Sequence, residues 1–166
     1  MKAVRYEENS LVLLDQTLLP SEKREEVCRT YEQAAEAIKT MKVRGAPAIG
    51  VAAAYALVLA ARQYEGEDRR EMDDFLNKAK TDLAATRPTA VNLFWALERM
   101  EAVWKNNPSL STAQLREKLE QEAVAVDRED LARNKRIGRL GSGLIPPKAA
   151  ILTHCNAGAL ATTGYG

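Results

Sequence analysis

The sequence predicts an α+β fold that is mostly helical, with a small antiparallel sheet, a helix bundle and the first strand of a second, parallel α/β domain. Three observations lead to this prediction. The first thirty residues alternate apolar and polar side chains between turn formers. Residues 30–142 then carry apolar side chains at helical spacing, punctuated by capping residues and proline. A short apolar run at 149–152 follows a segment rich in glycine and proline.

Three short strands are predicted at the amino-terminal end. Residues 3–6 alternate apolar with polar side chains, and residues 11–14 form a second apolar run after the turn chemistry of Glu8-Asn9-Ser10. A loop at 20–23 leads to residues 25–29, where we expect a third strand with Val27 pointing inward. Sequential strands with short connections favour an antiparallel sheet.

The next part of the chain predicts three helices in succession. Thr30 and Gln33 form a capping-box pair at the start of the first. Pro47 suits the first turn of the second, because its missing N–H has no partner there in any case, and this helix runs to about Tyr64. Residues 72–85 form the third helix, which Arg87-Pro88 interrupts.

Two further helices complete the predicted bundle. Thr89 is placed to cap the fourth, and Ser111 with Gln114 forms a second capping box for a long fifth helix that continues toward Gly141. The apolar face of the fourth helix comprises Leu93, Leu97, Met100 and Trp104.

A domain boundary is predicted near Pro146. Gly141-Ser142-Gly143 and Pro146-Pro147 resemble a linker. We therefore expect residues 1–147 to form a helical domain with a small β-sheet, and residues 148–166 to begin a truncated Rossmann-like domain. A parallel strand needs neighbours that the sequence does not supply, so the chain is interpreted as the amino-terminal part of a larger enzyme.

Composition restricts the class of protein. Charged residues make up 28 % of the chain, apolar ones 46 %, and the formal charge is +1 with acids and bases interleaved. This pattern indicates a globular domain and argues against a nucleic-acid partner. Two cysteines far apart in sequence, without a signal peptide, suit a reducing cytoplasm. The uncharged stretch from Ala46 to Ala61 is shorter than a bilayer span and is interpreted as a buried helix, not a membrane segment.

Two helix starts are candidates for binding an anion. Arg44-Gly45-Ala46 opens one helix, where Gly45 allows close backbone approach and the helix dipole and guanidinium favour phosphate. Arg87-Pro88-Thr89 has the same design at the next helix start, and the two arginines could converge on one phosphate. Each is equally the pattern of a plain loop-to-helix junction with a solvated arginine.

Cys155 is the candidate for chemistry. It ends the apolar run at the carboxyl end of a predicted strand, where α/β proteins place ligands, and Asn156 and small residues follow it. A thiol there can act as acid, base or nucleophile, although most cysteines are simply buried, as we expect for Cys28. His154 points to the opposite face of a strand and is interpreted as a packed, hydrogen-bonded histidine. One histidine and two distant cysteines do not make a zinc site, and no dinucleotide fingerprint is present.

Three motifs occur together and in one order. They are Val43-Arg44-Gly45-Ala46-Pro47-Ala48-Ile49-Gly50, Arg87-Pro88-Thr89-Ala90-Val91-Asn92-Leu93 and Thr153-His154-Cys155-Asn156-Ala157-Gly158. With the opening Ala3-Val4-Arg5-Tyr6 and Leu14-Asp15-Gln16-Thr17-Leu18-Leu19-Pro20, this set resembles the methylthioribose-1-phosphate isomerases of methionine salvage. The resemblance covers the whole chain but only the first half of a family member. The same family holds ribose-1,5-bisphosphate isomerases and regulatory subunits of the initiation-factor guanine-nucleotide exchange complex.

The resemblance implies an aldose–ketose isomerase of amino-acid biosynthesis, with a phosphorylated pentose as substrate and no metal or organic cofactor. It implies that Arg44, Gly45, Ala46 and Arg87 bind the substrate, chiefly its phosphate, and that Cys155 is one of two catalytic residues. The other is an aspartate of a carboxyl-terminal domain, through which a homodimer would also form. The alternatives are a ribose-1,5-bisphosphate isomerase, a non-catalytic regulatory subunit of the same family that senses sugar phosphates or nucleotides, and a stand-alone helical interaction domain. Since half of the catalytic pair lies elsewhere, the chain alone is expected to be inactive.

Overall fold

The computed structural model describes residues 2–166 and begins with a three-stranded sheet. Strands β1 (Val4–Glu7), β2 (Ser10–Leu14) and β3 (Glu25–Cys28) lie in that order, each antiparallel to the next. Glu8 and Asn9 form the β1–β2 turn with positive φ angles of 49° and 58°. The predicted antiparallel sheet is confirmed.

The orientation predicted for Val27 is wrong. Its side chain is 42 % exposed, whereas that of the adjacent Cys28 is fully buried. Successive side chains of a strand point to opposite faces, and the register sets Cys28 opposite Leu11 on the core side. Val27 therefore faces outward, and the expected burial of Cys28 is confirmed.

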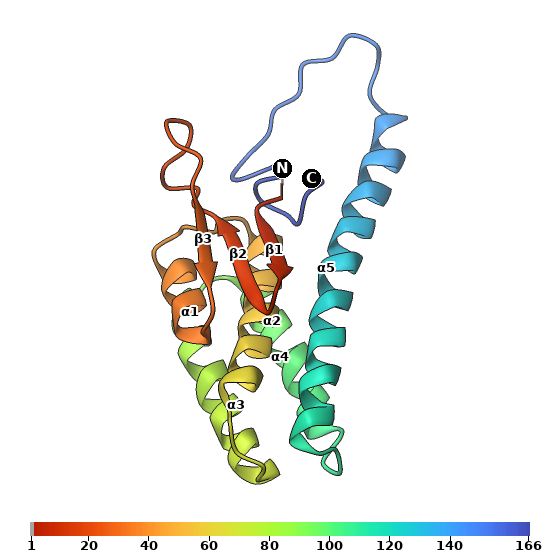
Figure 1. The fold of residues 1–166 in the computed structure, drawn as a ribbon. Helices are drawn as coiled ribbons and strands as arrows, with labels where there is room; N and C mark the ends of the chain where they lie inside the picture. The colour runs from red at the N-terminus through yellow and green to blue at the C-terminus, as the bar shows by residue number, and fades with distance from the viewer. Residues whose placement is uncertain (1) are drawn as a thin grey trace.

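Helix α2 (Ala46–Gln63) is the centre of the molecule. It packs against the other four helices and against β1 and β2 (Figure 1), and its residues from Ala48 to Ala61 are all buried. A helix that is apolar on every side needs such surroundings, and its many alanines let neighbours approach closely. It is long and apolar enough to cross a membrane, but 78 % of that stretch is buried inside the protein. The prediction of a buried core helix is confirmed.

The remaining helices surround α2, and their starts follow the sequence signals in most cases. They are α1 (Tyr31–Lys39), α3 (Arg69–Ala84), α4 (Val91–Lys105) and α5 (Thr112–Ser142). Both predicted capping boxes, at Thr30 and at Ser111, are formed. The predicted apolar face of α4 is buried. Thr89 is the exception, because Ala90 occupies the N-cap of α4 and no side chain caps the helix.

The expected strand at the start of a Rossmann-like domain is not formed. Residues 148–166 contain neither helix nor strand, and Cys155 has a left-handed φ of +63°. A strand exists only through hydrogen bonds to a neighbour, and none pairs with these residues in the described chain. After α5, the chain crosses the top of the molecule and turns back so that its end lies beside the amino terminus (Figure 1). Gly164 lies close to Lys2 there.

Candidate functional site

The start of α2 is shaped by a close backbone contact. Gly45 occupies the N-cap with a φ of +91°, and a Cβ on it would lie 2.4 Å from the Cα of Ala161. Only glycine fits both the conformation and the space. The backbone N–H of Ala48 donates to the Ala161 carbonyl oxygen at 3.1 Å. Since Pro47 has no N–H, the helix start offers fewer bare amides than the sequence pattern alone suggests.

The start of α4 lies against the same end of α2. A Cβ on Gly50 would lie 2.9 Å from the carbonyl oxygen of Asn92. This glycine therefore lets the first turn of α4 approach the second turn of α2. The turn before α4 is closed by a 3.0 Å hydrogen bond from the Ala90 N–H to the Arg87 carbonyl oxygen. Arg87, at the beginning of this turn, therefore lies beside the start of α2, with Arg44 and Gly45.

The segment around Cys155 passes over these two helix starts. The Cys155 side chain is exposed, and its positive φ is uncommon for a residue with a Cβ. Such backbone strain persists only where the surroundings impose it and is frequent at functional sites. His154 is exposed, so the prediction that it is a packed histidine is wrong. It also lines neither of the two cavities described below.

One cavity of about 320 Å³ brings the predicted residues together. Arg44, Gly45, Ala46, Arg87 and Cys155 all line it, although they come from three separate parts of the chain. Both arginines therefore line the same cavity. The cavity is also lined by Met41, Ile49, Thr89, Ala90 and Asn156.

A second cavity of about 350 Å³ adjoins the first. The two share Arg44, Cys155 and Asn156 as lining residues. The second cavity adds Gln16 and Leu19 of the β2–β3 loop, together with Ala157 and Leu160. Sequence reasoning did not place Gln16 and Leu19 in the site. Their only signal was the segment Leu14–Pro20, which belongs to the family resemblance but carries no recognisable site chemistry.

The charge of the two cavities suits an anion. Their lining residues include two arginines and no aspartate or glutamate. A guanidinium presents paired N–H donors that match phosphate oxygens. The exposed Cys155 and its neighbour Asn156 line both cavities and so lie at their junction.

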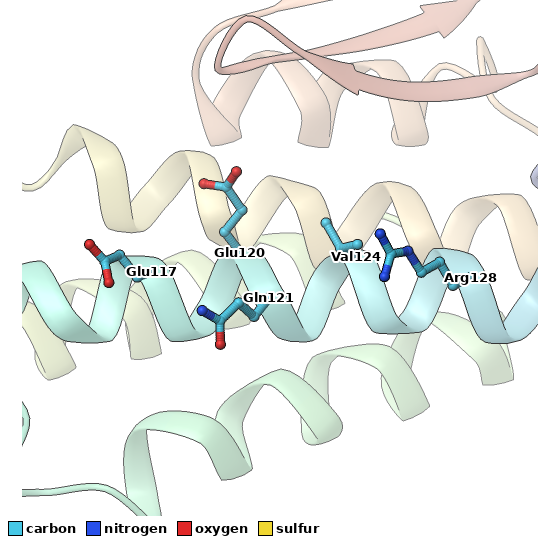
Figure 2. A pocket seen from close by; sticks show the side chains of 5 residues that line it. All are labelled: Glu117, Glu120, Gln121, Val124 and Arg128. Atoms are coloured by element: carbon cyan, nitrogen blue, oxygen red, sulfur yellow. The ribbon is translucent and has the colours of Figure 1, made fainter.

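A larger hollow of about 460 Å³ on α5 has a different character. Its lining side chains all come from one helix (Figure 2), and it shares no residue with the other two cavities. It mixes acidic and basic groups, and Glu120 is already paired with Arg62. Among residues 2–166, no group of three histidine, cysteine or acidic side chains is placed to hold a metal ion.

Comparisons with known proteins support a common architecture. The chain is 52 % identical over 166 residues to a methylthioribose-1-phosphate isomerase of Heliobacterium modesticaldum, and covers 48 % of that relative. It is 50 % identical over 163 residues to a 5-deoxyribose 1-phosphate isomerase of Bacillus cereus, covering 47 % of it. The chain thus spans about half the length of the curated relatives that it matches.

Solved structures agree with these relatives. The crystal structure of a 5-methylthioribose 1-phosphate isomerase from Pyrococcus horikoshii matches 99 % of this chain with a TM-score of 0.93 and 42 % identity, over 46 % of its own length. The delta subunit of translation initiation factor eIF-2B from A. fulgidus matches 99 % of this chain with a TM-score of 0.87 and 41 % identity, over 47 % of its own length. A model of the initiation factor 2 subunit family matches residues 42–163. The chain therefore belongs to the initiation factor 2 subunit family.

Proposed function

We propose that this chain supplies the phosphate-binding half of the active site of a sugar-1-phosphate aldose–ketose isomerase. The observation that carries the proposal is the single cavity lined by Arg44, Arg87 and Cys155. The substrate class is a 5-deoxy or 5-methylthio pentose 1-phosphate, as the names of the isomerase relatives suggest. Conversion of 5-methylthioribose 1-phosphate to 5-methylthioribulose 1-phosphate belongs to methionine salvage.

Arg44 and Arg87 bind the phosphate group. Gly45 and Ala46 add the helix start, whose dipole favours negative charge. Holding the phosphate firmly matters because an anomeric phosphate can leave when the furanose ring opens. The two arginines therefore bind the substrate and also keep its phosphate group from leaving.

Cys155 takes part in the movement of hydrogen. Isomerisation opens the ring by protonating the ring oxygen, and then shifts a hydrogen from carbon two to carbon one. We assign Cys155 to that shift, as base or as stabiliser. The family resemblance assigns the ring-opening acid to an aspartate in the half of the protein that this chain does not cover.

The second cavity favours an uncharged group at the sugar's fifth carbon. Its lining includes the apolar Leu19, Ala157 and Leu160, and Arg44 is its one basic residue. A second phosphate there would compete with the first for Arg44. This argues for a deoxy or methylthio sugar and against the alternative of a ribose 1,5-bisphosphate substrate. The exposed Cys155 at the junction argues against the other alternative, a purely regulatory subunit.

The test uses the complete polypeptide, with the length of the isomerase relatives. We expect ketose 1-phosphate to form from 5-methylthioribose 1-phosphate or 5-deoxyribose 1-phosphate, and much more slowly from ribose 1,5-bisphosphate. Cys155→Ser should lower kcat on the order of a hundredfold or more while inhibition by inorganic phosphate stays unchanged. Unchanged turnover in this variant would remove Cys155 from the mechanism. The present chain alone should show no turnover.

Three further features belong to the same proposal. Residues 148–155 become the first strand of a Rossmann-like domain when the rest of the polypeptide supplies its partner strands. The complete protein acts in the cytoplasm, and it forms a homodimer through that second domain.

A further inference from the structure

We infer that Asp130 is a positioning residue that fixes Cys155 above the helix starts of α2 and α4. The inference concerns a buried contact between α5 and the last turn of the chain. Asp130 is 7 % exposed and Thr163 is completely buried. Its geometry stands without the proposed function, and only its effect on turnover rests on that function.

The contact is a paired hydrogen bond. One carboxylate oxygen of Asp130, Oδ2, accepts from the Thr163 backbone N–H at 3.1 Å and from the Thr163 hydroxyl at 3.0 Å. The other oxygen accepts from the Nδ2 of Asn134 at 3.1 Å, and this amide also donates to the Asp130 carbonyl oxygen. The partners of the buried carboxylate are therefore uncharged donors from the terminal turn and from its own helix.

A buried carboxylate is unfavourable unless its oxygens receive hydrogen bonds. Thr163 supplies two of them, so the α5 surface around Asp130 is satisfied only when the terminal turn is in place. Burying a polar group in this way selects one arrangement of the chain over others. The turn comprising residues 158–164, hereafter the terminal turn, thus has a single favoured position on α5.

The terminal turn is also hydrogen-bonded to the β2–β3 loop and to the first turn of α2, which contribute lining residues to the two cavities. The Leu160 carbonyl oxygen accepts from Gln16 Nε2 at 2.8 Å, and the Ala161 carbonyl oxygen accepts from the Ala48 N–H. Cys155 precedes the terminal turn by only a few residues and is itself exposed. Residues 144–155 are exposed throughout. In this chain the position of Cys155 therefore depends on the turn that follows it, and Asp130 anchors the far end of that turn; in the complete protein the turn acts together with the strand proposed for residues 148–155.

Spin labelling measures this positioning directly in the chain. A nitroxide on Cys155 and a second on an exposed site of α4, introduced by Glu98→Cys, report the distance between the segment and the helices; Cys28 is buried and stays unlabelled. We expect a narrow distance distribution in the parent chain. Asp130→Ala and Thr163→Val should both broaden it, while Thr163→Ser, which keeps the hydroxyl, should restore it. Arg128→Ala is the matched control, because Arg128 lies on the same helix but is exposed and faces away from the buried Asp130.

Steady-state kinetics of the complete isomerase gives the second readout. A misplacement of about 1 Å lowers turnover on the order of a hundredfold. In Thr163→Val, kcat should fall to that extent while inhibition by inorganic phosphate, which depends on Arg44 and Arg87, is retained. Thr163→Ser should recover most of kcat.

The outcomes separate this inference from the proposed function. A distribution that stays narrow in both Asp130→Ala and Thr163→Val, or that broadens equally in Arg128→Ala, overturns the positioning role. Broadening in these variants, together with no isomerase activity of the complete polypeptide, supports the positioning role and refutes the proposed function. If Asp130→Ala does not fold, the Thr163→Val and Thr163→Ser pair decides the question.

Discussion

Gly45 and Ala161 meet backbone to backbone, so that a Cβ added to residue 45 would lie 2.4 Å from the Cα of Ala161 and 2.5 Å from its carbonyl oxygen. The contact joins the first turn of the central helix to the terminal turn of the chain. It explains why a glycine stands at residue 45, within the first of the three family motifs. It also ties the arginine-bearing helix start to the segment that carries Cys155.

Replacing Gly45 by alanine should therefore destabilise the protein. The new side chain would meet Ala161 and would have to adopt a φ of +91°. We expect a loss of about 2 kcal/mol or more in the free energy of unfolding, measured by urea denaturation. Gly141→Ala is the control, because its Cβ would meet nothing within 4 Å and it lies in the last turn of α5. That change should be neutral or stabilising by up to about 1 kcal/mol, since alanine favours helix. Equal effects at the two sites would contradict the close contact.

The two arginines of the first cavity should bind inorganic phosphate. Removing a charge-assisted hydrogen bond typically weakens binding on the order of tenfold or more, so Arg44→Ala and Arg87→Ala should each raise the Kd for phosphate by that factor. Isothermal titration of the chain at low salt measures it. Arg29→Ala, an exposed arginine that lines neither cavity, should leave the Kd unchanged. A Kd unaffected by both cavity variants would mean that the helix starts are only structural.

The two cysteines should react very differently with a thiol reagent. Cys155 is exposed, whereas burial raises the pKa of the Cys28 thiol to about 11. At pH 8 we expect one thiol to react in the native protein and a second only after denaturation. Rapid reaction of both in the native state would show that β3 does not bury Cys28.

The same raised pKa makes stability depend on pH at the alkaline end. The folded state holds the Cys28 proton more tightly than the unfolded chain, in which a thiol has a pKa of about 8.5. Its contribution is therefore fully present below about pH 8.5 and is lost as the pH rises toward 11. Cys28→Ser keeps the size without the titration. The stability difference between parent and Cys28→Ser, from urea denaturation at several pH values, should fall over that interval.

An ion pair between α4 and α5 should affect stability at acid pH. Arg99 donates to both carboxylate oxygens of Glu129, at 2.6 and 2.7 Å, and lowers the pKa of Glu129. A lowered folded-state pKa gives stability that is present above about pH 4.3, the unfolded value, and is lost as the pH falls through the folded value. Glu129 is 47 % exposed, so the effect should be no more than about 1 kcal/mol. Glu129→Gln should flatten the decline of stability between pH 5 and 3 by about that amount, whereas Glu117→Gln should leave it unchanged.

The helices show how far local sequence signals reach. The capping boxes at Thr30 and Ser111 and the proline in the first turn of α2 were all predicted, because each depends on hydrogen bonds or steric limits within four residues. Thr89 failed as a cap although its type and position were suitable. The hydrogen-bonded turn from Arg87 to Ala90 includes Thr89, so the N-cap of α4 is Ala90, one residue later than predicted. The capping preference of a single residue type does not predict such a shift.

The site shows what local signals leave undecided. The sequence alone determined the order and approximate limits of the helices and of the antiparallel sheet, the core role of α2, and the presence of arginines at two helix starts, a pattern that suits an anion. Only the tertiary structure decided that Val27 faces outward, that residues 148–155 pair with no strand, and that Gln16 and Leu19 line a second cavity beside Arg44. It also brought Asp130 to Thr163. The physical reason is that helices satisfy their hydrogen bonds within a few residues of themselves, whereas strand pairing, cavities and buried polar contacts need partners that are distant along the chain.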